Sequence, residues 1–86
     1  MKIELKKFGD VLTSRPAGRE AFAAIRPTLD LNASEVEIDF SDIISLSPSW
    51  ADEFFRPLNQ LYNNNIIFLS SDNPLVKATL GILDIK

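Results

Sequence analysis

The sequence contains neither cysteine nor histidine among its 86 residues. This absence excludes disulfides, thiol nucleophiles, zinc sites built on Cys and His, a Ser-His-Asp triad and a histidine pH switch. Any enzyme chemistry would have to use carboxylates, lysines or the single tyrosine. We therefore expect a binding or regulatory module and not an enzyme, with no catalytic residues, no metal site and no cofactor.

Long apolar runs and a strong charge of one sign are also missing. No apolar run approaches the roughly 18 residues of a membrane span, and the opening MKIELKK is unlike a signal peptide. The net charge is −3, and no basic stripe with interleaved aromatics is present. We expect a cytoplasmic protein that binds neither nucleic acid nor membranes.

What is present is enough hydrophobic material for one small core. Hydrophobic residues make up 45% of the chain and include eight aromatics, a composition that excludes a disordered or low-complexity chain. A chain of this length has room for one domain. The sequence therefore predicts a single domain over residues 1–86.

Alternating and continuous apolar segments predict three strands. Apolar and charged residues alternate over residues 2–6 and 35–40, and residues 66–69 are continuously apolar. The apolar stretch at residues 43–46 has two interpretations, because it can extend the sheet or fill space beneath a loop.

Three helices are predicted between and after these strands. The candidate segments cover residues 14–25, 47–61 and 74–83. The first two begin with a capping residue type, and all three have a proline in the first turn. Pro27 should end or kink the first helix, and Pro57 should kink the second.

The order β-α-β-α-β-α predicts an α/β fold with a mostly parallel or mixed sheet of three to four strands and about three helices on one face. Strict alternation in the first two strands indicates that the other sheet face is open to solvent. We expect Lys2, Glu4, Glu35 and Glu37 to be exposed, and Ile3, Leu5, Val36 and Ile38 to be buried.

In this topology all strand-to-helix turns meet at one sheet edge, where open α/β sheets usually bind ligands and partners. Arg15 lies in a first helical turn, where a cation faces the positive end of the helix dipole. It therefore needs a carboxylate, which Asp39, Asp52 or Glu53 could supply; phosphate or partner binding is the alternative. The partner-binding residues predicted from this edge are Arg15, Asp39, Ser47, Ser49, Trp50, Asp52, Glu53 and Phe55.

The turn at the second helix start allows several roles. Asp52 and Glu53 are adjacent in a helix and point about 100° apart, so they cannot face one another as a catalytic pair. They can complement the helix dipole, and Asp52 can close a capping box with Ser49. Either Ser47 or Ser49 can be the cap; both are candidate phosphoacceptors, and a first-turn Pro48 favours Ser47 as the cap.

Aromatic residues on the second helix have two expected roles. Trp50, Phe54, Leu58 and Leu61 follow helical spacing and predict a core stripe. Phe55 lies off this stripe, so it could be exposed and anchor an interface.

The stretches FGDVLTSRPAGREAF and VEIDFSDIISLSPSWADEFFRPL resemble a bacterial STAS-like domain family of unknown function, a relative of the STAS domains of anti-sigma factor antagonists and sulfate transporters. In the matching pattern, a Ser-Arg pair opens the first helix, here Ser14-Arg15, and an Asp-Phe pair ends the central strand, here Asp39-Phe40. An aromatic-Ala-Asp-Glu run opens the second helix, here Trp50 to Glu53, and an Asn-x-x-Val-like element precedes the last helix, here Asn73 with Val76.

The resemblance implies a non-catalytic interaction module that docks a protein partner, with a histidine-kinase-like ATPase as the candidate. In the antagonists, the turn before the second helix has an Asp-Ser-Ser-Gly-type motif with a phosphorylated serine. Here Pro48 occupies about that position and Trp50 replaces the glycine. Because a phosphate on Ser49 would also lie near Asp52 and Glu53, we expect this turn to bind its partner unmodified.

Two other functions fit the same sequence. The helix N-termini could bind a small molecule, nucleotide or anion. Alternatively, the domain could have a structural role and contribute an edge strand to an assembly.

Overall fold

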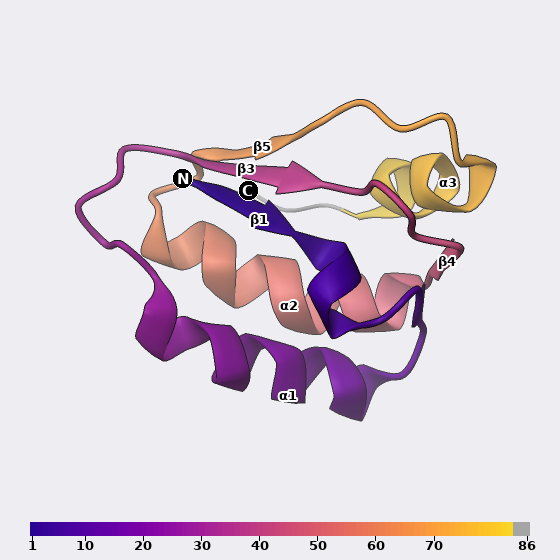
Figure 1. Ribbon diagram of the computed structural model, residues 1–86, viewed down its shortest axis with the longest axis horizontal. Coiled ribbons are helices and arrows are strands. Elements are labelled where there is room, and N and C mark those ends of the chain that lie inside the picture. The colour runs from indigo at the N-terminus through magenta and orange to yellow at the C-terminus, as the bar shows by residue number, and fades with distance from the viewer. Residues whose placement is uncertain (84–86) are drawn as a thin grey trace.

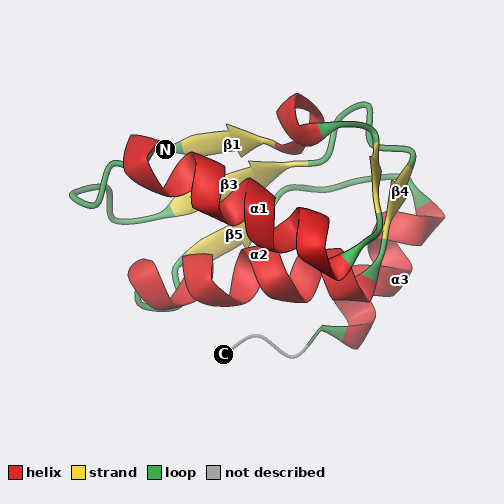
Figure 2. Ribbon diagram, turned by 90° about the horizontal axis from the view of Figure 1, so that it is seen from below, coloured by secondary structure: helices red, strands yellow, loops and turns green. Residues whose placement is uncertain are grey.

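The computed structural model describes residues 1–83, which form a sheet with two helices on one face and a third helix beyond the end of the sheet (Figures 1 and 2). All strand pairs are parallel, as the βα order predicts, so the predicted α/β class is confirmed. The main sheet has the order β1-β3-β5, with β1 at Lys2–Glu4, β3 at Val36–Asp39 and β5 at Ile66–Phe68. A separate two-stranded ladder consists of β2 at Val11–Leu12 and β4 at Ser45–Leu46.

Three α-helices were predicted, and three occur in the described residues. They are α1 at Arg15–Ile25, α2 at Pro48–Leu61 and α3 at Pro74–Ile82, with short 3-10 turns at Leu5–Phe8 and Arg26–Thr28. Helices α1 and α2 run side by side beneath the sheet, whereas α3 lies beyond the carboxyl end of β3, next to β4 (Figures 1 and 2). Adding strands in one direction with right-handed crossovers places α1 and α2 on the same face.

The opposite sheet face is open, as the alternation predicts. Lys2, Glu4 and Glu35 are exposed, and Ile3, Leu5, Val36 and Ile38 are buried. Glu37 is half-buried because it lies on the central strand, in register with Lys2 on one side and Ile67 on the other. Leu5 is buried as predicted, but it begins a 3-10 turn and does not continue β1.

The apolar stretch at residues 43–46 partly joins a ladder and partly fills the core. Ser45 and Leu46 pair with Val11 and Leu12, while Ile43 is buried. Sequence reasoning did not find β2. Leu12 and Leu46 face each other in register and are both buried, so this ladder connects the first strand-to-helix loop to the start of α2.

Two prolines and an asparagine run shape the helix ends. Helix α1 ends at Ile25, before Pro27, as predicted. Pro57 lies inside α2 without ending the helix. Asn63 and Asn64 take left-handed φ values of 53° and 68°, which asparagine tolerates better than most residues, so the chain turns there into β5.

Gly18 sets the separation of α1 and α2. A Cβ atom on this residue would lie 2.6 Å from the carbonyl oxygen and 3.0 Å from the Cα of Trp50. Glycine inside a helix costs roughly 1 kcal/mol relative to alanine, but here it lets the two backbones meet. This contact places the first turn of α1 against the first turn of α2.

We predict that Gly18→Ala lowers the free energy of unfolding by roughly 1–3 kcal/mol, because overpacking outweighs the gain in helix propensity. Gly81 is the matched control, since it also lies in a helix but a Cβ there would meet nothing within 4 Å. Gly81→Ala should leave stability unchanged or raise it. Urea unfolding followed by the fluorescence of Trp50 measures both, and equal stability of the two variants would show that the close approach is unimportant.

Candidate functional site

The strand-to-helix turns meet at one edge of the structure, and each helix start there has its own side-chain cap. Ser14 Oγ accepts a hydrogen bond from Ala17 N at 3.1 Å, and Ser47 Oγ accepts one from Trp50 N at 3.2 Å. Asn73 Oδ1 accepts from Leu75 N at 2.8 Å. A side-chain cap satisfies one of the free N–H groups at a helix start, so each start is partly occupied by the protein itself.

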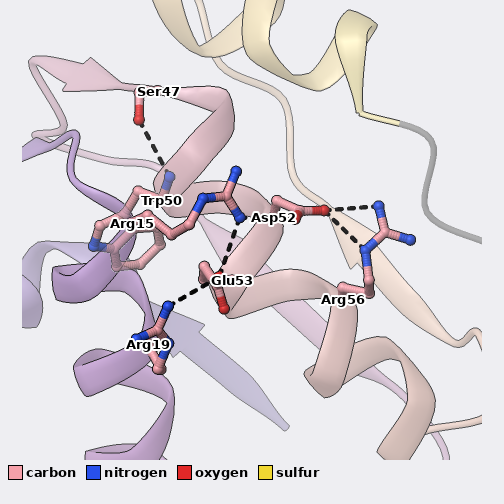
Figure 3. A network of polar contacts seen from close by, with 7 residues as sticks. All are labelled: Arg15, Arg19, Ser47, Trp50, Asp52, Glu53 and Arg56. Carbon is pink, nitrogen blue, oxygen red and sulfur yellow. Dashed lines mark hydrogen bonds and ion pairs between the residues drawn. The ribbon is translucent and has the colours of Figure 1, made fainter.

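Five charged side chains form a network on the adjacent surfaces of α1 and α2 (Figure 3). Arg15 Nη1 lies 3.1 Å from Glu53 Oε1 and 3.2 Å from Asp52 Oδ2. Arg19 Nη2 is 3.5 Å from the same Glu53 oxygen, and Arg56 Nη2 is 2.7 Å from Asp52 Oδ1. We call Arg15, Arg19, Asp52, Glu53 and Arg56 the arginine–carboxylate face.

The expected pairing of Arg15 is confirmed for two of its three candidate carboxylates. Asp39 is not part of the face. Its Oδ2 lies 3.4 Å from Lys2 Nζ, and its Oδ1 accepts hydrogen bonds from the Ser41 hydroxyl and amide at 2.7 and 2.9 Å. Asp39 therefore organises the loop after β3, which is a separate part of the edge.

The network keeps its carboxylates ionised. Hydrogen bonds from Arg56 and then Arg15 lower the pKa of Asp52, and a hydrogen bond from Arg15, assisted by Arg19, lowers the pKa of Glu53. The same bonds to Glu53 and Asp52 raise the pKa of Arg15. The arginine side chains are 48–65% exposed and the carboxylates 25–30%, so the face is open to solvent.

The structure identifies Ser47 as the cap of α2, as Pro48 in the first turn favours. Its hydroxyl also donates to Thr13 O, which ties α2 to the loop before α1. The capping box between Ser49 and Asp52 was therefore a wrong prediction, since Ser49 is inside the helix and Asp52 binds arginines. Of the two candidate phosphoacceptors, Ser47 has its hydroxyl committed to structure, and Ser49 is half-buried in the first turn.

Trp50 and Phe55 do not belong to an exposed edge. Trp50 is 1% exposed and Phe55 is 0% exposed, so neither can contact a partner in this fold. The expected exposure of Phe55 was wrong because α2 packs on two sides. Phe54 stacks on Trp50 and meets Phe8, whereas Phe55 packs edge-on against Phe68 of β5. The core role of the Trp50 stripe is confirmed.

Sequence reasoning missed Arg19 and Arg56. A spacing signal was available for both, because residues four apart share a helix face. Arg19 follows Arg15 by four residues, and Arg56 follows Asp52 by four. The remaining step, placing the two helices against one another, required the fold.

The two carboxylates of the face do not suit general acid catalysis. A general acid at neutral pH needs a raised carboxyl pKa, whereas the pKa values of Asp52 and Glu53 are lowered. Within residues 1–83, no group of three or more Asp and Glu side chains could hold a metal ion. What five oriented, exposed charges can do is recognise a complementary surface.

A family model for the STAS-like domain of unknown function (DUF4325) matches residues 17–75, about two thirds of the chain. The chain belongs to this STAS-like family. The match confirms the resemblance drawn from the sequence and includes Arg19, Asp52, Glu53 and Arg56, while Ser14 and Arg15 precede it. Searches of curated proteins and of solved structures found no match.

None of the helices in residues 1–83 has both the length and the apolar character needed to cross a membrane.

We predict that Ser47→Ala lowers the free energy of unfolding by about 1 kcal/mol, the usual cost of removing a helix cap. For a domain of this size, that loss corresponds to a melting temperature lower by roughly 4–8 °C. Ser49→Ala, two residues away, should change stability by less than about 0.5 kcal/mol. Thermal unfolding of both variants tests the assignment, which is wrong if Ser49→Ala is the more damaging change.

The face should also make stability depend on pH in the acid range. Both carboxyl pKa values are lower in the folded protein than their ordinary values of 3.8 for Asp52 and 4.5 for Glu53. Their stabilising effect is therefore present at pH values above these ordinary values, and it is lost progressively as the pH falls from them through the lowered pKa values of the folded protein. Glu53→Gln should be less stable than the wild type at neutral pH, and the difference should shrink in acid. A difference that grows on acidification would contradict the ion pairing.

Proposed function

We propose that this domain is a non-catalytic, regulatory protein-interaction module that docks its partner through the arginine–carboxylate face. The observation that supports the proposal is the geometry of that face. Its five charged side chains come from two helices that are fixed by the Gly18–Trp50 contact. They lie at the edge where open α/β sheets bind partners. The proposal includes a cytoplasmic role in a bacterium, as the resemblance to anti-sigma factor antagonists implies.

The chemistry of the face indicates the charge of the partner surface. Three arginines and two carboxylates leave one positive charge in excess. Guanidinium groups have five N–H donors each, and the ion pairs within the face use only some of them. A partner surface with exposed carboxylates would use the remaining donors, so we propose an acidic docking surface on the partner.

Exposed ion pairs contribute little to stability, typically 0–1 kcal/mol, so fold stability alone does not require a five-member network. Their stronger effects are on specificity and on the rate of association. A docking surface whose charges are already oriented would gain both specificity and a faster association with its partner. A histidine-kinase-like ATPase, implied by the resemblance, is the candidate partner.

The helix starts favour docking over the alternative of binding an anion at their N-termini. Ser14, Ser47 and Asn73 already accept hydrogen bonds from first-turn N–H groups. An anion at the start of α2 would also lie beside Asp52 and Glu53. The structural edge-strand role stays an untested hypothesis.

Reversing one charge on the face tests the proposal. The partner is first identified by cross-linking to the wild-type domain in its native cell, and its affinity is then measured with both proteins purified. Glu53→Lys should abolish binding even though it adds positive charge, because it removes the carboxylate that holds Arg15 and Arg19 and repels both guanidinium groups from their positions in the face. Glu35→Lys makes the same change in charge on the open sheet face and should bind normally.

A second pair of variants avoids the contacts between α1 and α2. Arg56 pairs with Asp52 within α2, so Arg56→Glu alters the face without separating the helices. It should weaken binding, while Arg26→Glu at the far end of α1 should not. Ser49→Ala should leave binding nearly intact. Equal binding by all variants, or a partner that captures only phosphorylated protein, would overturn the proposal.

A further inference from the structure

A pocket of about 510 Å³ opens between the end of β5 and α3, and none of the residues of the arginine–carboxylate face lines it. Its volume falls within the range of about 300–1,000 Å³ that is typical of small-molecule sites. It also lies at the carboxyl end of a parallel strand, the usual position of ligand sites in open α/β sheets. Neither the family description nor the proposed docking role accounts for this pocket.

The walls of the pocket are held in place by the rest of the fold. Asn73 Nδ2 donates to Ile43 O at 2.7 Å and to Ile44 O at 3.1 Å, and the Thr79 hydroxyl donates to Leu46 O. These bonds attach α3 to the β3–β4 segment. On the other wall, Phe68 packs against Phe55 at 5.1 Å between ring centroids. The pocket is therefore preformed.

The lining of the pocket combines an apolar part with two opposite charges. Phe68, Leu69 and Leu80 form the accessible apolar part, and Asp72 and Lys77 supply one charge of each sign. Within residues 1–83, neither Asp72 nor Lys77 forms an ion pair with another side chain. Both side chains are exposed, so a ligand can reach their charges.

We propose that this pocket binds a small zwitterion with an apolar body, namely a free apolar amino acid. Lys77 would bind its carboxylate, Asp72 its ammonium group, and Phe68, Leu69 and Leu80 its side chain. A ligand with a carboxylate alone would be repelled by Asp72, and one with an amine alone by Lys77. This proposal does not depend on the docking function, because it can be tested without a partner.

Three probes of the same shape separate these contributions: phenylalanine, 3-phenylpropanoate, which lacks the ammonium, and phenethylamine, which lacks the carboxylate. Calorimetry gives the affinities, and amide chemical shifts locate the site. The emission of Trp50 gives a further readout, because Phe55 lies 5.1 Å from Phe68 and 6.2 Å from Trp50. Phenylalanine should bind about tenfold more tightly than either analogue, since each charged hydrogen bond contributes about that factor.

Variants of the two charged residues complete the test. Lys77→Met should weaken phenylalanine binding about tenfold without weakening phenethylamine, and Asp72→Asn should weaken phenylalanine without weakening 3-phenylpropanoate. Lys7→Met, on the distant 3-10 turn, is the control and should change nothing. The proposal fails if phenylalanine does not bind saturably, if either analogue binds as well, or if Lys77→Met binds phenylalanine like the wild type.

Discussion

The contact between Gly18 and the backbone of Trp50 is the constraint on which the rest of this structure depends. It brings the first turns of α1 and α2 together at a distance that a side chain at residue 18 would prevent. Arg15 lies one turn before this contact and Arg19 directly after it, while Asp52 and Glu53 follow Trp50 on the other helix. The interhelical ion pairs of 3.1–3.5 Å are therefore a consequence of backbone packing. The Ser47 cap fixes the same corner from the other side, through its bond to Thr13.

The sequence predicted the main sheet because each of its strands has a pattern with a physical cause. The alternation of apolar and charged residues in a strand indicates that one face of the sheet is buried. The βα order requires parallel pairing of the strands and places α1 and α2 on the same face. The β2–β4 ladder has only two residues in each strand, which is too short for any periodicity to appear. Its position depends on how the loops at the sheet edge pack, and this is a property of the folded chain.

Sequence reasoning could predict those contacts of the candidate site that depend on a residue's own position in its helix. Arg15 needed a carboxylate because of its place in a helix start, and the structure supplies two. Phe55 was misplaced because a single helical stripe was assumed, whereas α2 contacts α1 on one side and β5 on the other. Asp39 was misplaced because Ser41, two residues later, captures its carboxylate. Such competition between nearby partners is decided by loop geometry, which the residue pattern does not specify.

The residues that stabilise this small domain are different from those of the proposed docking surface. The large buried side chains, with Trp50, Phe54 and Phe55 at their centre, account for the apolar burial that folding requires. The charged side chains of the arginine–carboxylate face are all 25% exposed or more, so they contribute little to that burial. Their charges can therefore change without loss of the core, provided that Gly18 and Ser47 keep the helix starts in place. A surface of this kind can change its charge pattern while the fold beneath it remains the same.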